Sequence, residues 1–206
     1  FQLSSDALLL ILNAHTTSHM SNETWDERYR QDGDNIKEPA RFLVEQFSRL
    51  PRGRALDLAA GSGRNTLFLA EHGYPTDAVD ASQVAVDKLN DLAQRQSLPI
   101  ISTKADLPDH APAKNTYAVI LNFYFLERKL FLPIKEGLID GGMLLFETYT
   151  LEQARFGRPR NHEFLLKPNE LLHSFIDLHI IYYHERIDRS GKTPRAIASL
   201  LAEKRG

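Results

Sequence analysis

The chain has 206 residues and a formal net charge of −2, a length that suits one domain with a full hydrophobic core. The near-neutral charge argues against a nucleic-acid partner, because holding a phosphate backbone normally requires a clustered basic face. No residue is a cysteine, which excludes disulfides, zinc-thiolate sites and thiol nucleophiles and suits a cytoplasmic protein. The longest purely aliphatic run, residues 7–12, is far shorter than the roughly 20 residues of a membrane helix, so no membrane partner is expected.

The predicted elements begin after an N-terminal segment. Residues 1–21 are expected to be an extension, either derived from cloning or disordered, and residues 22–206 are expected to form a single domain. Over residues 36–50, apolar side chains recur at helical spacing until Pro51. This pattern predicts an amphipathic helix that precedes the first strand.

The central part of the chain alternates apolar strands with helices. Strands are predicted over residues 54–60, 76–80, 100–104, 117–121 and 143–148, and helices over 65–72, 82–96 and 128–139. Ser82 is the expected N-cap of the second helix, and Asp140-Gly141-Gly142 is expected to end the third. The alternation is typical of a parallel sheet with right-handed crossovers, so the predicted fold class is α/β.

The C-terminal third has a different pattern. A helix is predicted over residues 168–175, and strands over 178–185 and 195–202. Only nine residues separate these two strands, whereas a parallel connection needs about a dozen or more, so we expect an antiparallel hairpin. The expected architecture is a Rossmann-like, seven-stranded, mostly parallel sheet that ends in this hairpin, with helices on both faces.

A glycine turn follows the first predicted strand. Gly61 and Gly63 let the backbone approach a ligand closely, and the amides at the start of the next helix favour electron-rich groups. The dinucleotide fingerprint has a third glycine for close packing of helix and strand, and Thr66 occupies that position here. Thr66 therefore weakens the interpretation as a pyrophosphate site.

Acidic residues occur in or after the first three predicted strands. Asp80 ends the second strand, where a carboxylate can accept both hydroxyls of a ribose, in NAD and S-adenosylmethionine alike. Asp106 follows the third strand and would lie beside an adenine, with Leu107 against the ring; the alternative is a solvated loop residue or helix cap. Asp57 lies inside the first strand, where it would hold the loop or meet the amino group of a methionine moiety.

Three segments carry a family resemblance: LDLAAGSGRN (56–65), AVDAS (78–82) and ADL (105–107). They resemble the class I S-adenosylmethionine-dependent methyltransferases. Within that superfamily the chain is most similar to the small tellurite-resistance and thiopurine methyltransferase-like type, through WDERY (25–29) and FLLKPNEL (164–171). The resemblance covers roughly residues 22–204.

This resemblance implies S-adenosylmethionine as the cofactor. The implied contact residues are Tyr29, Asp57, Ala59, Gly61, Gly63, Arg64, Asp80, Ala81, Asp106, Leu107 and Asn122. Among them, Asp57 and the two glycines would hold the methionine end. Asp80 would bind the ribose, Asp106 the adenine, and Asn122 would lie beside the sulfonium.

Methyl transfer from a sulfonium is an in-line displacement, so the protein mainly positions the nucleophile and needs no catalytic triad. The candidate catalytic residues are Asn122, Tyr124, Arg155, Arg158, Arg160 and His162. We hypothesise that one of the three arginines orients an anionic acceptor; the alternative is a solvated loop. Tyr124 is either a ring near the sulfonium or part of the core, and His162 is either a base or a surface residue. Arg186 and Lys192, near the last hairpin turn, are further residues within reach of the site.

The predicted function is methyl transfer from S-adenosylmethionine to a small, anionic or soft nucleophilic acceptor: a chalcogen oxyanion, a thiol or a small metabolite. The alternatives are an NAD-linked oxidoreductase and a non-catalytic nucleotide-binding domain. No metal is expected, because His179 and His184 point to opposite faces of a predicted strand. The expected assembly is a monomer or homodimer.

Overall fold

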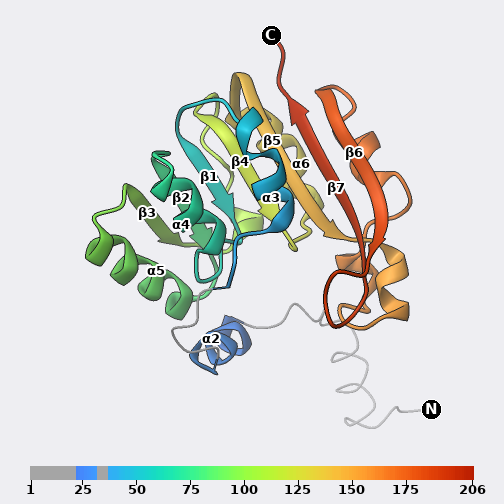
Figure 1. The fold of residues 1–206 in the computed structure, drawn as a ribbon, viewed down its shortest axis with the longest axis horizontal. Coiled ribbons are helices and arrows are strands. Elements are labelled where there is room, and N and C mark those ends of the chain that lie inside the picture. Colours follow the sequence, from blue (N-terminus) through green and yellow to red (C-terminus); the bar gives the residue numbers. More distant parts are fainter. Residues whose placement is uncertain (1–21, 32–36) are drawn as a thin grey trace, which may run out of the picture.

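The computed structural model describes residues 22–31 and 37–206, and the expectation for residues 1–21 lies outside them. In chain order, the strands of the described residues are β1 (Ala55–Leu58), β2 (Thr76–Asp80), β3 (Ile100–Lys104), β4 (Tyr117–Phe123), β5 (Leu138–Tyr149), β6 (His179–Asp188) and β7 (Arg195–Glu203). They form one seven-stranded sheet in the order β3-β2-β1-β4-β5-β7-β6 (Figure 1). β1 pairs in parallel with β2 and β4, whereas β7 pairs antiparallel with β5 and β6. The predicted α/β fold with a C-terminal hairpin is confirmed.

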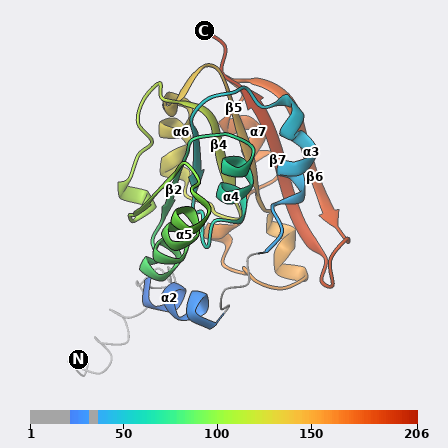
Figure 2. The same ribbon diagram turned by 60° about the vertical axis from the view of Figure 1, so that its left-hand side comes forward.

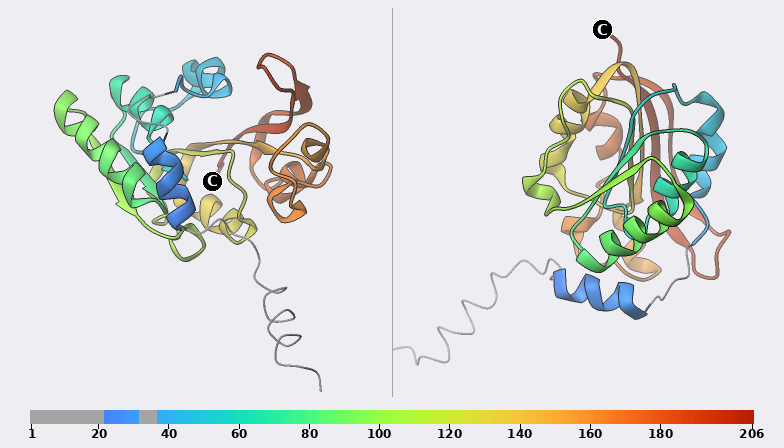
Figure 3. Two further views of the ribbon diagram at one scale, coloured as in Figure 1. Left: turned by 90° about the horizontal axis from the view of Figure 1, so that it is seen from below. Right: turned by 90° about the vertical axis from the view of Figure 1, so that its left-hand side faces the viewer.

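Helices cover both faces of this sheet. In chain order they are α2 (Asn22–Gln31), α3 (Arg41–Gln46), α4 (Arg64–Glu71), α5 (Gln83–Gln96), α6 (Phe131–Gly137) and α7 (Glu170–Ser174). Short 3₁₀ turns are η1 (Phe47–Arg49), η2 (Leu107–Asp109), η3 (Arg128–Leu130), η4 (Leu151–Arg155) and η5 (His162–Phe164). Figures 2 and 3 show α3, α4 and α5 on one face and α6 and α7 on the other. Among the residues that the structure describes, no helix has both the length and the apolar character that a membrane span requires.

Two hydrophobic clusters pack against the two faces. All seven residues of β4 are buried, as expected for a central strand between two helical layers. Leu56 and Ile120 belong to a cluster with Ile134 of α6, and Leu121 belongs to a second cluster with Leu69 of α4. Because neighbouring residues of a strand point to opposite faces, β4 supplies both clusters. Each fully buried leucine or isoleucine contributes about 1.5–3 kcal/mol.

The helix α5 begins and ends as the sequence predicts. Ser82 Oγ accepts a hydrogen bond from the backbone N–H of Ala85 at 3.2 Å, which satisfies one free amide of the first turn. Ser97 ends the helix with a left-handed φ of 53°. The predicted cap at Ser82 is confirmed.

The helix expected over residues 36–50 is shorter in the structure. α3 begins at Arg41 and gives way to the 3₁₀ turn η1 at Phe47. Ala40 keeps an extended backbone (ψ 129°), and its N–H donates to Asn65 Oδ1 of α4 at 2.8 Å. This tertiary hydrogen bond holds the chain outside the helix at a point where periodicity alone would continue it.

The expectation that Asp140-Gly141-Gly142 ends a helix is wrong. α6 ends at Gly137, and these three residues lie inside β5. Gly141 N–H donates to the carbonyl of Lys204, and Lys204 N–H donates to the carbonyl of Gly142, both at 2.8 Å. The segment after β7 therefore pairs with the glycines and keeps them in the sheet.

Candidate active site

The carboxyl ends of the central parallel strands meet at one edge of the sheet. Leu58 of β1 is in register with Val79 of β2 and with Asn122 of β4. The loop after β1, the carboxylate of Asp80 and the side chain of Asn122 therefore come together, as ligand sites in open α/β sheets require. Figures 1 and 3 show α2 lying across this edge.

The loop between β1 and α4 has an unusual backbone. Ala59, Gly61 and Gly63 all have positive φ, at 54°, 56° and 84°. A Cβ on Gly61 would lie 2.6 Å from Tyr29 Oη of α2, so a side chain at this position would displace α2. Gly63 precedes α4 without a side-chain cap, which leaves the first amides of that helix available to a ligand.

Asp57 and Thr66 form a buried pair behind this loop. Thr66 Oγ1 donates to Asp57 Oδ2 at 2.7 Å, and both residues are almost completely buried. Burial raises the pKa of Asp57 to about 7. The residue in place of a third glycine is therefore the hydrogen-bond partner of the acid inside β1. Of the two roles considered for Asp57, holding the loop has this support, and contact with a methionine amino group stays a prediction.

Asp80 supports the same loop from the end of β2. Its Oδ2 accepts from Gly61 N–H at 2.7 Å, and its Oδ1 accepts from Ser82 N–H at 2.9 Å. Burial raises the pKa of this carboxyl group. The backbone of Ala81 also donates to this carboxyl group. An ionised carboxylate offers about four acceptor positions, so one remains for a hydroxyl of a ribose. Ala81 lies between Asp80 and Ser82 and belongs to the same turn.

The end of β3 carries the residues expected beside an adenine. Asp106 is exposed, whereas Leu107 is buried and begins the 3₁₀ turn η2. On the other side of the site, Asn122 is buried and its Nδ2 donates to the carbonyl of Phe125 at 2.8 Å. This bond shapes the turn after β4.

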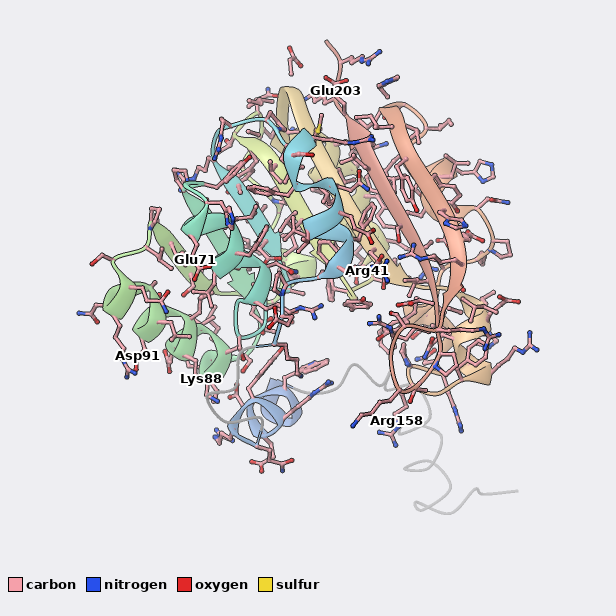
Figure 4. All side chains as sticks on the ribbon, viewed as in Figure 1. Arg41, Glu71, Lys88, Asp91, Arg158 and Glu203 are labelled. Atoms are coloured by element: carbon pink, nitrogen blue, oxygen red, sulfur yellow. The ribbon has the colours of Figure 1, made fainter. Side chains whose placement is uncertain are left out.

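The helix α2 is held against the site by polar contacts with α5. Asp26 Oδ1 accepts from Ser82 Oγ at 2.5 Å and from Val84 N–H at 3.3 Å. Lys88 of α5 lies next to α2 (Figure 4), and its Nζ donates to the carbonyl of Tyr29. The bond from Ser82 lowers the pKa of Asp26. The sequence interpretation included Tyr29 but missed Asp26, whose position next to Trp25 carries no signal of a cap in another helix.

A cavity of about 410 Å³ lies beside the glycine loop. Its walls come from the segment before α3, from α3, from the start of α4, from the residue after β4, and from β5, β6 and β7. The lining residues are Lys37, Glu38, Pro39, Ala40, Arg41, Phe42, Glu45, Arg64, Tyr124, Glu147, Tyr182, Arg186, Asp188 and Arg195. Arg64 also follows directly after Gly63, so the cavity and the glycine loop share a residue.

A hydrogen-bonded cluster forms one wall of the cavity. Tyr124 Oη donates to Glu147 Oε1 at 2.9 Å and accepts from Arg195 Nη1 at 3.1 Å. Glu147 Oε2 accepts from Ser199 Oγ at 2.5 Å and from Arg186 Nη2 at 3.3 Å. The sequence interpretation missed Glu147 and Arg195. Glu147 did carry a signal, because an acid within an apolar strand requires buried partners.

The three arginines predicted to bind the acceptor do not line this cavity. Arg155 is largely exposed and pairs with Glu152 at 3.7 Å. Figure 4 shows Arg158 in the segment after β5, below Arg41. His162 begins the 3₁₀ turn η5 and is exposed, and Arg160 precedes it. A role of these residues toward an acceptor stays a prediction, whereas Arg64, Arg186 and Arg195 line the cavity.

Within residues 22–31 and 37–206, no group of three or more histidine, aspartate or glutamate residues is arranged to hold a metal ion.

The geometry defines a class of protein. A seven-stranded sheet with β7 inserted antiparallel beside β5, a glycine loop after β1 and a buried acid at the end of β2 characterise a class I S-adenosylmethionine-dependent methyltransferase domain. The residues fit this cofactor, because Asp80 at the end of β2 keeps an acceptor position for a ribose and no side chain caps the first amides of α4.

The sequence places the chain in a particular family. Residues 24–197 match the model of the family described as Tellurite resistance protein TehB, and the chain belongs to this family. A protein named Hemagglutinin 1 from Eikenella corrodens is 29% identical over 143 residues, which are 65% of this chain and 46% of that protein. A probable S-adenosyl-L-methionine-dependent methyltransferase TehB from Haemophilus influenzae is 26% identical over 147 residues, 68% of this chain and 51% of that protein. The chain thus spans about half the length of the curated relatives it matches.

Solved structures share the fold. The crystal structure of TehB from Haemophilus influenzae aligns with a TM-score of 0.71 at 22% identity, over 88% of this chain and 67% of the other. A second solved structure aligns with a TM-score of 0.68 at 18% identity, over 89% of this chain and 92% of the other. Its description concerns the conversion of a disulfide bond into a thioacetal group during echinomycin biosynthesis. At these identities the likeness establishes the fold.

Proposed function

We propose that this chain transfers a methyl group from S-adenosylmethionine to a small acceptor bound in the cavity beside the glycine loop. The observation that carries the proposal is the position of Arg64, which follows Gly63 of the loop and also lines the cavity. In-line displacement requires the acceptor to approach the sulfonium directly. A cavity that adjoins the methionine end of the cofactor site meets this requirement.

The cofactor would be held by the edge of the sheet. Asp57, Gly61 and Gly63 are proposed to contact the methionine end, together with Ala59 and Arg64. Asp80 and Ala81 are proposed to bind the ribose, and Asp106 with Leu107 the adenine, while Asn122 lies beside the sulfonium and Tyr29 covers the loop. When bound, the cofactor supplies an activated methyl group. The chain orients it and shields the reacting atoms from water.

The acceptor would be a small anion or a soft nucleophile. Four arginines line the cavity, and guanidinium groups bind oxyanions and carboxylates with two parallel hydrogen bonds. Arg41 pairs with Glu45 of its own helix. Arg186 pairs with Glu147 and Arg195 with Asp188, whereas Arg64 has no ion-pair partner among the described residues. Arg64 is therefore the cation most available to an incoming anion. The name of the family, tellurite resistance protein, supports a chalcogen oxyanion, and thiols and small metabolites are the other acceptors to test.

Two measurements test this proposal. Calorimetry with S-adenosylmethionine, S-adenosylhomocysteine and NAD should show binding of the two sulfur ligands only. An acceptor screen with tellurite, selenite and carboxylate-bearing thiols should then show release of S-adenosylhomocysteine. Binding of NAD without any response to the sulfur ligands would favour an oxidoreductase, and cofactor binding without release of product from any acceptor would favour a binding domain.

A further inference from the structure

Tyr124 has a backbone conformation that residues other than glycine rarely adopt. Its φ is 60°, in the left-handed region, directly after the last residue of β4. For a bulky residue this conformation is strained, and such strain persists where the surroundings enforce it, often at functional sites. The strained backbone directs the ring to the cavity wall, two residues beyond Asn122.

Charged groups from three elements surround this ring. The guanidinium groups of Arg64 on α4 and Arg195 on β7 lie 5.4 and 5.7 Å from the centre of the Tyr124 ring. Glu147 on β5 accepts a hydrogen bond from the Tyr124 hydroxyl, and the ring centre of Tyr149 lies 5.2 Å from that of Tyr124. Tyr124 is thus placed between Arg64, which follows the glycine loop, and the hydrogen-bonded cluster that forms one wall of the cavity.

The hydrogen bonds of the Tyr124 hydroxyl have a direction. It donates to Glu147 Oε1 and accepts from Arg195 Nη1. A hydroxyl oxygen has two lone pairs, so one acceptor position remains. Burial raises the pKa of Tyr124, which keeps the phenol protonated and makes it unsuited to act as a base by itself.

The two carboxylate oxygens of Glu147 have different hydrogen-bond partners. Its Oε2 is occupied by Ser199 Oγ and Arg186 Nη2, whereas Oε1 contacts the tyrosine. Arg186 itself donates to Ser199 Oγ at 2.7 Å, which fixes the carboxylate plane. Protonation of Oε1 would therefore leave the other hydrogen bonds of Glu147 in place.

We propose that Tyr124 and Glu147 form a proton relay that deprotonates the acceptor during methyl transfer. The inference rests on the proposed function and deepens it, because it selects acceptors whose nucleophilic atom still carries a proton. The nucleophilic atom forms a bond to the methyl carbon, while the bond between carbon and sulfur breaks and its electron pair stays on sulfur. The proton of the nucleophile passes to Tyr124 Oη, and the phenolic proton passes to Glu147 Oε1. After product release, Glu147 returns the proton to water.

The charge of the cavity specifies the acceptor further. Five basic and four acidic side chains line it. This near balance favours an acceptor with a single negative charge over a more highly charged anion. The expected substrate class is therefore a monoanion whose nucleophilic atom carries a proton, such as a thiol that bears one carboxylate.

Two thiols distinguish the relay from a structural role. Thionitrobenzoate is an aromatic thiol that is already ionised at neutral pH and carries two negative charges with its carboxylate. Mercaptopropionate is an aliphatic thiol that is largely protonated and carries one. Each variant is compared with the wild type on the same thiol, so the difference in charge between the two thiols cancels. In Tyr124→Phe, kcat/KM for mercaptopropionate should fall by about 100-fold, the usual effect of losing general acid-base assistance. For thionitrobenzoate it should fall by no more than about fivefold, the effect of one lost hydrogen bond.

The pH profile gives a second readout. With mercaptopropionate, the rate of Tyr124→Phe should rise with pH in parallel with ionisation of the thiol, whereas the wild-type rate should depend far less on pH. Glu147→Gln, which keeps the shape of the side chain but takes up no proton, should show the same selective loss. The matched control is Tyr149→Phe, which removes the hydroxyl of the neighbouring ring and should lower neither rate selectively.

The outcomes separate the relay from the proposed function. An equal loss with both thiols in Tyr124→Phe would overturn the relay and leave methyl transfer intact. No release of S-adenosylhomocysteine from either thiol by the wild-type protein would contradict thiol methylation and overturn the relay with it. Tyr124→Phe keeps the ring and its packing, so this variant decides the question even if Glu147→Gln fails to fold.

Discussion

Thr66 Oγ1 donates a hydrogen bond to Asp57 Oδ2 at 2.7 Å, and this bond links the first helix after the glycine loop to the strand before it. A dinucleotide site would have glycine at position 66 for close packing. Here the threonine instead satisfies one oxygen of a buried carboxyl group. Thr66, which argues against a pyrophosphate site, therefore stabilises the junction between β1 and α4 on either side of the glycine loop.

Thr66→Val should destabilise the protein by about 1–3 kcal/mol, because it leaves a buried acceptor of Asp57 without a partner. Denaturant unfolding at neutral pH measures the effect. Thr66→Ser is the matched control, since it keeps the hydroxyl and should lose less. Equal stability of the valine and serine variants would contradict the importance of this bond.

The stability of the protein should depend on pH through Asp57. Its pKa of about 7 in the folded chain lies above its value in an unfolded chain, so the native state binds more protons between these values. The unfolding free energy contributed by this group is fully present below about pH 4 and falls as pH rises to about 7, by at most about 1.4 kcal/mol per pH unit. Asp57→Asn removes this contribution. Subtracting the unfolding free energies of wild type and variant at each pH isolates it from Asp188, whose pKa of about 2 acts in the opposite direction. A difference that is constant across this pH range would show that Asp57 is ionised throughout.

Asp80→Ala should weaken binding of S-adenosylmethionine by about 1–3 kcal/mol, through a lost hydrogen bond to the ribose and a less ordered Gly61. Calorimetric titration provides the comparison. Asp87→Ala is the control, because Asp87 lies exposed on α5 and accepts a hydrogen bond from Gln83 on the same helix. Unchanged affinity of Asp80→Ala for S-adenosylmethionine would contradict the proposal that Asp80 binds the ribose.

Arg64→Gln should raise the KM for thionitrobenzoate by about tenfold or more, the effect of one charged hydrogen bond. The comparison is a chain in which Arg155, Arg158 and Arg160 are all changed to glutamine. These three residues lie outside the cavity lining, and the triple variant should keep a KM close to that of the wild type. The opposite pattern would move acceptor recognition to the segment after β5.

Much of the cofactor side of the site was predictable from the sequence. Gly61, Asp80 and Asp106 lie at or shortly after the ends of β1, β2 and β3, and each can be placed from the short stretch of sequence around it. The register of a parallel sheet then brings the ends of its strands together. Strand boundaries at Thr76–Asp80 and Ile100–Lys104 match the predicted ones because a short apolar run between turn residues defines them.

The acceptor side was not predictable in the same way. The hairpin of β6 and β7 was expected from its short connection, but its position in the sheet was not. The hairpin itself places Arg195 opposite Asp188, whereas Ser199 comes opposite Glu147 because β7 inserts between β5 and β6. These pairs join segments separated by 52 residues in one case and 7 in the other. Only the strand order brings them to the cavity that Arg64 shares.

The most direct test of methyl transfer uses S-adenosylmethionine with an isotopically labelled methyl group. The wild-type protein is incubated with tellurite, selenite, thionitrobenzoate or mercaptopropionate, and the products are examined by mass spectrometry. We predict that the label appears on at least one of these acceptors, together with an equal amount of S-adenosylhomocysteine, and that Asp80→Ala slows its appearance. Label that stays on S-adenosylmethionine with all four acceptors, although the cofactor binds, would contradict the proposed function.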